Sequence, residues 1–456
     1  MATARQVPRA AGNRLALLRA LSRDPLSTAT RLRREHGPIV LLPVPGLRIY
    51  LVSDPPAIHD ALTLTNRAYG KGLARRRDPT GEAIRPLERI LGDGLLISSG
   101  ELWRRQRRLM APLFRHARIA EFGATFASLA EQTGEGWRDG EVRDIHRDMT
   151  ELTLGIVART ILDVDLDGEV VAHIRRSLAT NQKTARRRVV PWGRWADRLP
   201  LPSTRRWNAD LAALDAVVYR LIAQRRATGG ADGRGDLLSL LLSARDEETG
   251  EGMADGQVRD EVVTMLLAGH ETTASALAWA FHLLGQHAAA QRRLGAELDE
   301  VLGGRLPDAA DLPRLRYTAA VVHESMRLYP PAWVLARRLL APREVCGYLL
   351  PAGATMVFSP WLVHRDPDLW PEPDRFEPER WLGPPSERPR FAYFPFGAGP
   401  RQCIGNGFAE MESVLVLATL CRRWWVGPAG TTPVTPAALV TLRPRAGVPM
   451  TVRRRD

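Results

Sequence analysis

The sequence predicts a mainly helical protein with a minor β component. Apolar residues recur at helical spacing through most of the chain, and the alternation typical of strands is confined to short segments. Proline and glycine dominate residues 366–400, so we expect an irregular loop there, and glycines make 229–235 the clearest linker. The expected helices lie within 14–34, 60–226, 255–287, 289–302, 317–328 and 405–423, a hairpin at 38–43 and 48–53, and further strands within 332–360.

Cysteine content and the N-terminus indicate the compartment. The 456 residues include only three cysteines, too few for a disulfide framework, which fits a reducing compartment. Arginines interrupt every apolar run near the N-terminus, so neither a secretory signal nor a transmembrane span is expected. We therefore expect a cytoplasmic protein.

Positive charge comes almost entirely from arginine, with lysine only at Lys71 and Lys183 and a formal net charge of +13. The arginines are dispersed among acids and lack the interleaved aromatic residues that stack on bases, so no nucleic-acid partner is expected. The segment 101–118 carries six arginines against one acid. It is a candidate docking face for an acidic protein.

One cysteine lies in an unusual loop, Phe396–Gly405, immediately before an expected helix. A thiolate at a helix N-terminus is stabilised by the helix dipole and by backbone N–H groups, and glycines allow a flat group to approach the backbone. Arg401 is placed to reach a carboxylate beside such a group. The alternative, that Cys403 is a buried structural cysteine in a glycine-rich turn, is disfavoured. Cys346 and Cys421 are expected to be inert.

The long helix 255–287 contains Ala268-Gly269-His270-Glu271-Thr272-Thr273 at its centre. A mid-helix glycine costs about 1 kcal/mol relative to alanine, so it needs a reason, and space is one. A Thr272 hydroxyl bonded to the preceding turn would open the helix slightly, making room for dioxygen and a water molecule. His270 is expected in the core or at the surface, whereas Thr273 serves either packing or a proton route.

These segments resemble those of cytochromes P450. Phe396, Gly399, Arg401, Cys403 and Gly405 fill the family's F-x-x-G-x-R-x-C-x-G pattern, and residues 268–273 fill A-G-x-[DE]-T-T. The resemblance implies the P450 fold as a single domain over 1–456, with 1–70 as an N-terminal helix and β-rich part and 71–456 as the haem-binding helical body. It also implies haem b with Cys403 as the iron ligand, since a thiolate favours O–O cleavage.

The resemblance also assigns roles to single residues. Thr272 would bond the iron-bound oxygen and Glu271 would supply protons. Glu324 and Arg327, three residues apart on a helix, would form a buried pair completed by Arg380. The haem would contact Ala268, Gly269, Phe396, Gly397 and Gly405. Its propionates would bind Trp103, Arg107, Arg401 and either Arg337 or Arg338, of which Arg337 fits better. The substrate pocket would be lined by Ala268, Trp333 and Val334.

The implied activity is mono-oxygenation: one atom of O₂ enters an apolar substrate by hydroxylation or epoxidation. A terpenoid or another secondary metabolite is favoured as the substrate. Electrons would come from an external ferredoxin and its reductase, and the protein would be a monomer. The alternatives are a peroxygenase of the same fold that uses H₂O₂ and a non-catalytic haem protein. The pair Glu271 and Thr272 disfavours the peroxygenase, which often lacks it. A non-catalytic haem protein would need neither proton delivery nor docking of a reductase, so it is disfavoured too. Segments 70–88 and 174–206 carry no motif and, by the resemblance, would cover the pocket.

Overall fold

The computed structural model describes residues 6–10, 13–72, 85–163, 201–227, 236–246, 248–384 and 389–455. Most of 70–88 and 174–206, and all of the expected linker 229–235, lie outside these ranges. The chain forms two compact units, each built from separated segments. Unit 1 comprises 1–81, 320–406 and 435–445, and unit 2 comprises 82–319, 407–434 and 446–456. A single domain over the whole chain stays a prediction.

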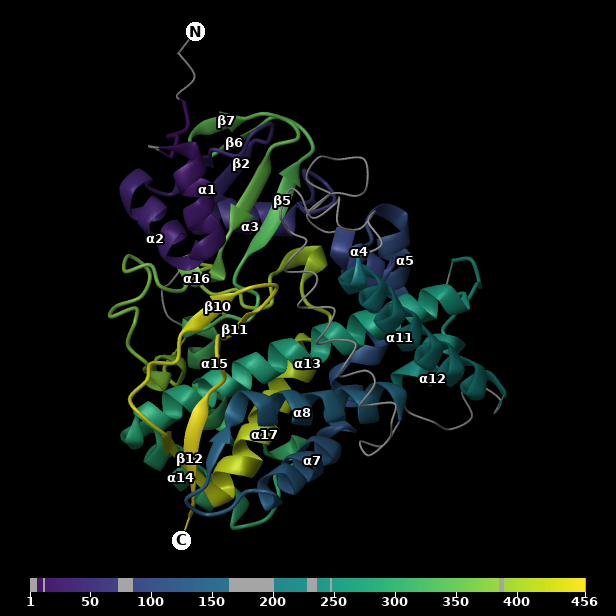
Figure 1. Ribbon diagram of the computed structural model, residues 1–456, viewed down its shortest axis with the longest axis vertical. Helices are drawn as coiled ribbons and strands as arrows, with labels where there is room; N and C mark the ends of the chain where they lie inside the picture. The colour runs from purple at the N-terminus through teal and green to yellow at the C-terminus, as the bar shows by residue number, and fades with distance from the viewer. Residues whose placement is uncertain are drawn as a thin grey trace. The chain divides into compact units, whose positions relative to one another are not determined.

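A five-stranded sheet, in the order β1-β2-β8-β5-β3, forms the centre of unit 1 (Figure 1). The first two strands are antiparallel neighbours, which confirms the predicted hairpin. Strand β8 then pairs in parallel with β2 and antiparallel with β5. The strands are β1 (Ile39–Leu42), β2 (Ile49–Val52), β3 (Tyr69–Lys71), β5 (Leu335–Leu339) and β8 (Thr355–Phe358).

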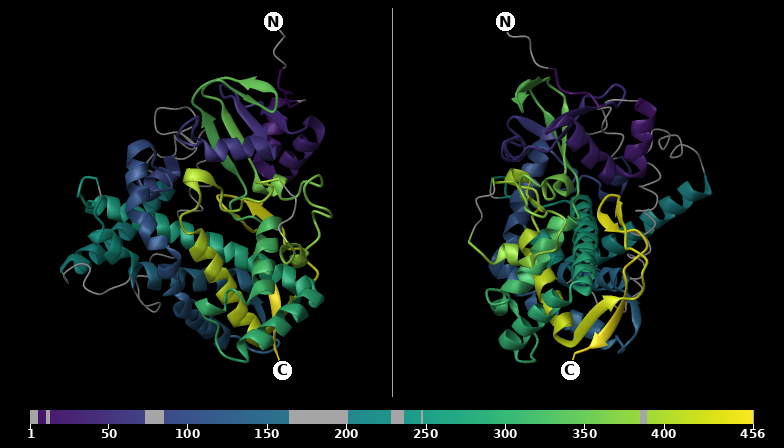
Figure 2. Two further views of the ribbon diagram at one scale, coloured as in Figure 1. Left: turned by 180° about the vertical axis from the view of Figure 1, so that it is seen from behind. Right: turned by 90° about the vertical axis from the view of Figure 1, so that its left-hand side faces the viewer.

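Alternating side chains let helices cover both faces of this sheet. Val40 and Leu51 pack with Leu17 and Leu32 of helices α1 (Arg14–Arg23) and α2 (Pro25–His36), the purple pair seen beside the strands in Figure 2. Their neighbours on the opposite face pack against α3 (Pro55–Thr63). The sequence predicted one helix over 14–34. The chain instead breaks at Asp24, whose carboxylate caps α2 by accepting the Ser27 N–H at 3.1 Å.

Smaller elements complete unit 1. The hairpin of β6 (Arg343–Val345) and β7 (Tyr348–Leu350) turns at Cys346 and Gly347, whose φ values of 51° and 76° suit a two-residue turn. Cys346 therefore lies in a turn within the stretch expected to be strand. The others are β10 (Pro436–Ala438), β11 (Leu442–Pro444), α16 (Pro360–Val363), the 3₁₀ turns η5 (Pro378–Trp381) and η6 (Gly399–Arg401), and most of α15 (Arg316–Leu328).

Unit 2 is built around helix α13 (Asp255–Gln286), with α8 (Ile145–Val157) running along it (Figure 1). Strands β4 (Val142–Asp144), β9 (Trp424–Pro428) and β12 (Pro449–Arg454) form a small antiparallel sheet. The other helices are α4 (Arg85–Leu91), α5 (Gly100–Met110), η2 (Ala111–Phe114), α6 (His116–Ala120), α7 (Gly123–Glu135), η3 (Ala158–Leu162), α11 (Pro202–Ala227), α12 (Leu237–Ser243), α14 (Ala288–Leu302), η4 (Ala309–Asp311) and α17 (Asn406–Arg423).

The predicted fold class, mainly helical with minor sheets, is confirmed. The helices expected at 255–287, 289–302, 317–328 and 405–423 begin and end within one residue of the observed bounds. Strands β3 and β4, by contrast, fall inside the region that the sequence predicted as helical with breaks. Each has three residues, too few for an alternating pattern to show.

Gly72 provides a test of packing in unit 1. A Cβ at this position would lie 2.3 Å from the Ala336 carbonyl carbon and 2.5 Å from the Arg337 nitrogen, both backbone atoms of β5. We expect Gly72→Ala to lower the free energy of unfolding by about 1–3 kcal/mol, because the strand must shift. Thermal and denaturant unfolding measure this. Gly383→Ala, where the space is open, is the control and should have almost no effect.

Candidate functional site

The cysteine loop of unit 1 is held by its own backbone. The Cys403 N–H donates to the Phe396 carbonyl at 3.0 Å, and the Gly397 N–H donates to Phe394 at 3.0 Å. Gly397 and Gly399 have φ values of 65° and 67°, and a Cβ at Gly399 would lie 2.2 Å from the Leu62 carbonyl oxygen. Glycine is therefore required at 399 by both conformation and space. The thiol of Cys403 is exposed, as a ligand for an added group must be.

The other two cysteines differ from Cys403. Burial raises the pKa of the Cys346 thiol and of the Cys421 thiol to about 12. Both are therefore protonated at neutral pH, and a protonated thiol is a poor nucleophile and a poor metal ligand.

Arg337 of β5 tests whether unit 1 suits a haem propionate. Its side chain is buried, donates to the Thr65 hydroxyl at 2.8 Å and to the Ala336 carbonyl at 2.9 Å, and has no carboxylate within ion-pair distance among the described residues. Burial lowers the pKa of the guanidinium to about 10. A buried cation that lacks a protein anion is well matched to an anionic group of a cofactor. Arg338, the alternative, is only half-buried on the neighbouring strand position.

Glu324 and Arg327 of α15 form a fully buried ion pair, with both side chains 0% exposed. Two parallel hydrogen bonds of 2.8 Å join the guanidinium to the carboxylate. The third predicted member, Arg380, lies with its Nε 3.4 Å from Glu324 Oε1. The three residues that the sequence grouped are thus brought together.

Neighbours of this pair extend it into the following loop. The Arg327 guanidinium also donates to the carbonyls of His364, Pro373 and Arg375 at 2.6–3.0 Å. Glu324 accepts the Trp381 indole N–H at 2.9 Å and the Glu377 N–H at 3.0 Å. The Trp381 contribution was not predicted, because an indole N–H carries no periodic signal.

Buried His364 links the pair to the cysteine loop. Its Nε2 accepts the Phe394 N–H at 3.0 Å, and the Phe394 carbonyl in turn accepts the Gly397 N–H. Burial, together with the positive charges of Arg327 and Arg365, holds the pKa of His364 well below its usual value. The imidazole is therefore neutral and able to accept.

Helix α13 of unit 2 opens at its centre. Between Glu261 and Leu284 every residue is buried except Ala268, Gly269 and Thr272. Ala268 and Thr272 are one turn apart, so both belong to one face. The Thr272 hydroxyl donates to the Ala268 carbonyl at 2.7 Å, as expected, and the Thr273 hydroxyl donates to Gly269 at 3.0 Å.

Residues beside this opening face other parts of unit 2. A Cβ at Gly269 would lie 3.0 Å from Val157 Cγ2, so the small size of this residue also lets α8 pack closely. His270 is buried, with its Nδ1 2.6 Å from the Leu266 carbonyl oxygen, and burial lowers its pKa. It therefore belongs to the core, which was one of the two roles expected. Glu271 is also buried.

Helix α5 carries Trp103, which is buried, and Arg107, which is half-buried. Other arginines of this helix pair with acids of unit 2. Arg105 and Arg108 lie 3.8 Å and 3.1 Å from Asp246, whose carboxylate is 0% exposed, and Arg104 pairs with Glu101. These ion pairs partly neutralise the arginines of 101–118, so the net positive charge of this surface is smaller than the sequence suggested.

A carboxyl that the sequence analysis missed lies on α17. Glu412 is buried, and burial raises its pKa well above the ordinary value, although the nearby Thr273 hydroxyl favours the charged form. Burial therefore favours the protonated form of this carboxyl. Its only sequence signal is an acid within an otherwise apolar helical run, 411–421.

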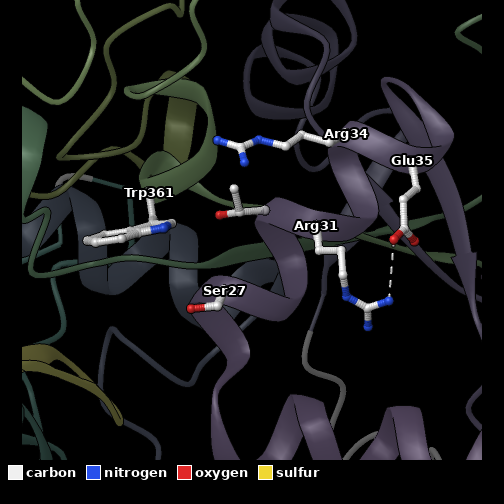
Figure 3. Close-up of a pocket in the computed structure, with 6 residues that line it drawn as sticks. Ser27, Arg31, Arg34, Glu35 and Trp361 are labelled. Carbon is white, nitrogen blue, oxygen red and sulfur yellow. Dashed lines mark hydrogen bonds and ion pairs between the residues drawn. The ribbon is translucent and has the colours of Figure 1, made fainter.

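Two hollows lie in unit 1. A surface groove of about 550 Å³ on α2 is lined by Arg31, Arg34 and Trp361, with Arg31 turned towards Glu35 (Figure 3), and contains none of the predicted residues. A smaller apolar hollow of about 110 Å³ is lined by Trp333 and Val334, the two predicted pocket residues, together with residues of α2, β1 and β2. The Trp333 indole N–H donates to the Leu439 carbonyl at 2.9 Å.

A family model described as Cytochrome P450 matches residues 11–448. The chain belongs to the cytochrome P450 family. P450s bind haem b, and two features of unit 1, the cysteine loop and the buried Arg337, fit such a group. The protein is therefore a haem-dependent mono-oxygenase, which uses O₂ and requires a redox partner.

Several relatives have specific names. The chain is 39% identical to cyclooctatin synthase of Streptomyces melanosporofaciens, over 92% of this chain and 90% of the relative. It is 40% identical to cyclooctat-9-en-7-ol 5-monooxygenase of the same organism, over 91% of this chain and 88% of the relative. It is 34% identical to pentalenene oxygenase of Streptomyces avermitilis, over 89% of this chain and 88% of that one. Within the described ranges, no helix has both the length and the apolar character needed to cross a bilayer.

The buried pair predicts a large loss of stability for Glu324→Gln. Removing its charge leaves the Arg327 guanidinium buried without a counter-charge, so we expect the free energy of unfolding to fall by about 3–5 kcal/mol, or the protein to fail to accumulate. The matched control is Glu372→Gln, which alters an exposed Glu–Arg pair with Arg375 at the same spacing. It should cost no more than about 1 kcal/mol. Equal losses in the two variants would contradict the folding role.

Proposed function

We propose that Cys403 binds the haem iron, that Arg337, Arg401, Trp103 and Arg107 bind the propionates, and that Thr272 and Glu271 deliver protons for the splitting of O₂. The observation that carries the proposal is the pattern around Cys403: an exposed thiol at the end of a glycine-constrained loop, in a chain whose other thiols have raised pKa values. Bound haem supplies the oxygen-activating chemistry, and the thiolate favours O–O cleavage.

The protein's own contribution is proton control. The Thr272 hydroxyl donates to Ala268, and it can rotate about its Cα–Cβ bond to donate towards the open face of α13. Glu271, the preceding residue, is the proposed source of its protons. Glu412 interacts with the Thr273 hydroxyl, and burial favours its protonated form, so we propose it as a second proton store in the same unit. Two proton deliveries are needed, so two carboxyl groups suit the task.

The proposed substrate is an apolar terpenoid or similar secondary metabolite. Ala268, Trp333 and Val334, the candidate pocket residues, carry no charge, and Trp333 and Val334 line an apolar hollow. The names of relatives support the same class, since they include an unsaturated hydrocarbon, pentalenene, and an unsaturated alcohol, cyclooctat-9-en-7-ol. Hydroxylation or epoxidation suits such molecules. The low cysteine content favours action in the cytoplasm. A monomer is proposed by the family resemblance.

Electrons are proposed to come from a ferredoxin and its reductase. An acidic ferredoxin would be attracted to arginines of 101–118. Because Arg104, Arg105 and Arg108 already pair with acids, the exposed Arg115 is the better test. No ion pair of Arg115 occurs within the described ranges.

The first test is spectroscopic. The reduced protein with carbon monoxide should show the red-shifted Soret band of thiolate ligation, and Cys403→His should lose it. Cys346→Ser, which changes a thiol of raised pKa, is the control and should keep it. A histidine-type band in the intact protein would falsify the assignment of Cys403.

Removing the Thr272 hydroxyl should separate electron use from product formation. We expect Thr272→Ala to keep consuming NADPH but to divert most of the electrons to hydrogen peroxide, because protons reach the wrong oxygen atom. The share of electrons that ends in peroxide should be severalfold larger than in the wild type. Product, peroxide and NADPH are measured together. Thr150→Ala is the control, since that hydroxyl makes the same type of bond in α8, to His146. Full coupling in Thr272→Ala would rule out the proposed role.

Arg115→Gln should slow reduction by an acidic ferredoxin about twofold at low salt and reduce the dependence of the rate on salt. Stopped-flow reduction measures the rate, and a substrate titration should be unchanged. Arg19→Gln, which removes an equally exposed charge from α1, is the control. An unchanged rate across the salt range would exclude Arg115 from the docking face.

A further inference from the structure

Two polar side chains near the start of α13 have no role in the mechanism above. Glu261 is 0% exposed and Thr264 is 2% exposed. Residues seven and eleven positions after Glu261 on a helix return to the same face, and these are Ala268 and Thr272. Glu261 and Thr264 therefore lie on the face of α13 that opens at its centre.

Each of these side chains has a polar atom without a partner. Glu261 Oε2 accepts the Leu95 N–H at 2.9 Å, but Oε1 has no hydrogen-bond partner among the described residues. The Thr264 hydroxyl has none there either, whereas Thr272 and Thr273 donate to carbonyls of the preceding turn. Buried polar atoms are seldom left unpaired, because losing water without replacement is unfavourable. A core that served only packing would have apolar residues at these two positions.

The wall opposite these atoms is well anchored. A Cβ at Gly94 would lie 2.2 Å from the Thr264 hydroxyl oxygen and 2.8 Å from the Asp260 carbonyl oxygen, so the backbone of 92–95 lies directly against the helix. The Asp93 N–H donates to Asp260 at 2.8 Å. Arg259 donates to the Ile90 carbonyl and to Asp260, each at 2.9 Å. The unpaired atoms are thus held in place rather than exposed by a loose loop.

Protonation determines which ligand suits this place. Burial raises the pKa of Glu261 to about 8, and the charge of Asp260 adds to the effect. At neutral pH the carboxyl is therefore uncharged and can both donate and accept a hydrogen bond. The charge of the neighbouring Asp260 is already paired with Arg259. A neutral hydroxyl fits these groups better than an ion does.

Two other roles fit less well. The described residues contain no cluster of acids, histidines and cysteines able to hold a metal ion. Direct proton transfer to Thr272 is excluded by length, since eleven residues of helix span about 16 Å. Thr264, by the same rise, lies about 6 Å before Ala268 and about 12 Å before Thr272.

We propose that Glu261 and Thr264 form a subsite that binds a hydroxyl group already present on the apolar substrate. The natural substrate is then an apolar alcohol, oxygenated once before it reaches this enzyme, and not a hydrocarbon. An oxygenation or a hydration must therefore precede this step. The proposal rests on the proposed function and specifies the substrate class for that same site.

The test uses ligands that the haem iron itself anchors. Two series of 1-alkylimidazoles of increasing chain length, one ending in a methyl group and one in a hydroxyl, are titrated into the haem-loaded protein, and the Soret shift gives the Kd. In an apolar pocket the terminal hydroxyl weakens binding at every length. With the subsite present, one chain length should instead bind about tenfold more tightly with the hydroxyl than without it, the effect of one well-made hydrogen bond.

Variants identify the residues responsible. Thr264→Val, almost the same shape, and Glu261→Leu should each remove this optimum and leave the methyl series unchanged. Glu261→Gln, which keeps a donor and an acceptor, should retain most of it and serves if Glu261→Leu folds poorly. Thr419→Val is the control, because that buried hydroxyl bonds within α17, to Leu415.

The outcomes are distinct. No optimum at any length, or an optimum that persists in Thr264→Val and Glu261→Leu, overturns the subsite, whose polar atoms then bind only internal water. The carbon monoxide spectrum of the same samples tests the proposed function separately. A thiolate band without an optimum refutes the subsite alone, whereas loss of the band refutes the assignment of Cys403.

Discussion

The buried pair of Glu324 and Arg327 organises the part of unit 1 that leads to the cysteine. The Arg327 guanidinium fixes the carbonyls of a loop without regular structure. The Glu324 carboxylate fixes both ends of η5, through Glu377 just before it and Trp381 at its last residue. From Arg327 the bonds continue through His364 to Phe394 and on to the cysteine loop. Burying two charges costs desolvation free energy. Here the carboxylate and the guanidinium each also bond to neutral groups, which offset that cost.

Local patterns made much of this predictable. Glu324 and Arg327 are three residues apart on a helix, and the cysteine loop and the opening in α13 are each continuous in sequence. Such short motifs can be matched to a family, and the resemblance to cytochromes P450 then implied their roles. The long helices were predicted closely because their apolar periodicity extends over many turns. The hairpin of β1 and β2 was predicted from a different pattern, the alternation of residues on both sides of a turn.

Contacts between distant segments were not predictable. His364 accepts from a residue thirty positions later, and Trp381 reaches back to Glu324, and neither bond leaves a periodic trace. Net charge misled in the same way. The arginines of α5 looked unopposed because Asp246, which binds two of them, lies far along the chain. Asp24 divided an expected single helix because the capping preference of one residue outweighed the periodicity around it.

The carboxyl groups of Glu324 and Glu261 are bonded differently, and the difference separates a folding role from the proposed role in binding. Around Glu324 both carboxylate oxygens are bonded, so those residues stabilise one geometry. Along α13, Glu261 and Thr264 have polar atoms without a hydrogen-bond partner in the part of the chain that the structure describes. Ala268, Gly269 and Thr272 are only half-buried, whereas their neighbours are buried. A protein selected for stability alone would fill these positions with apolar side chains. Their persistence on one helix face is expected if that face meets a ligand that completes the missing bonds.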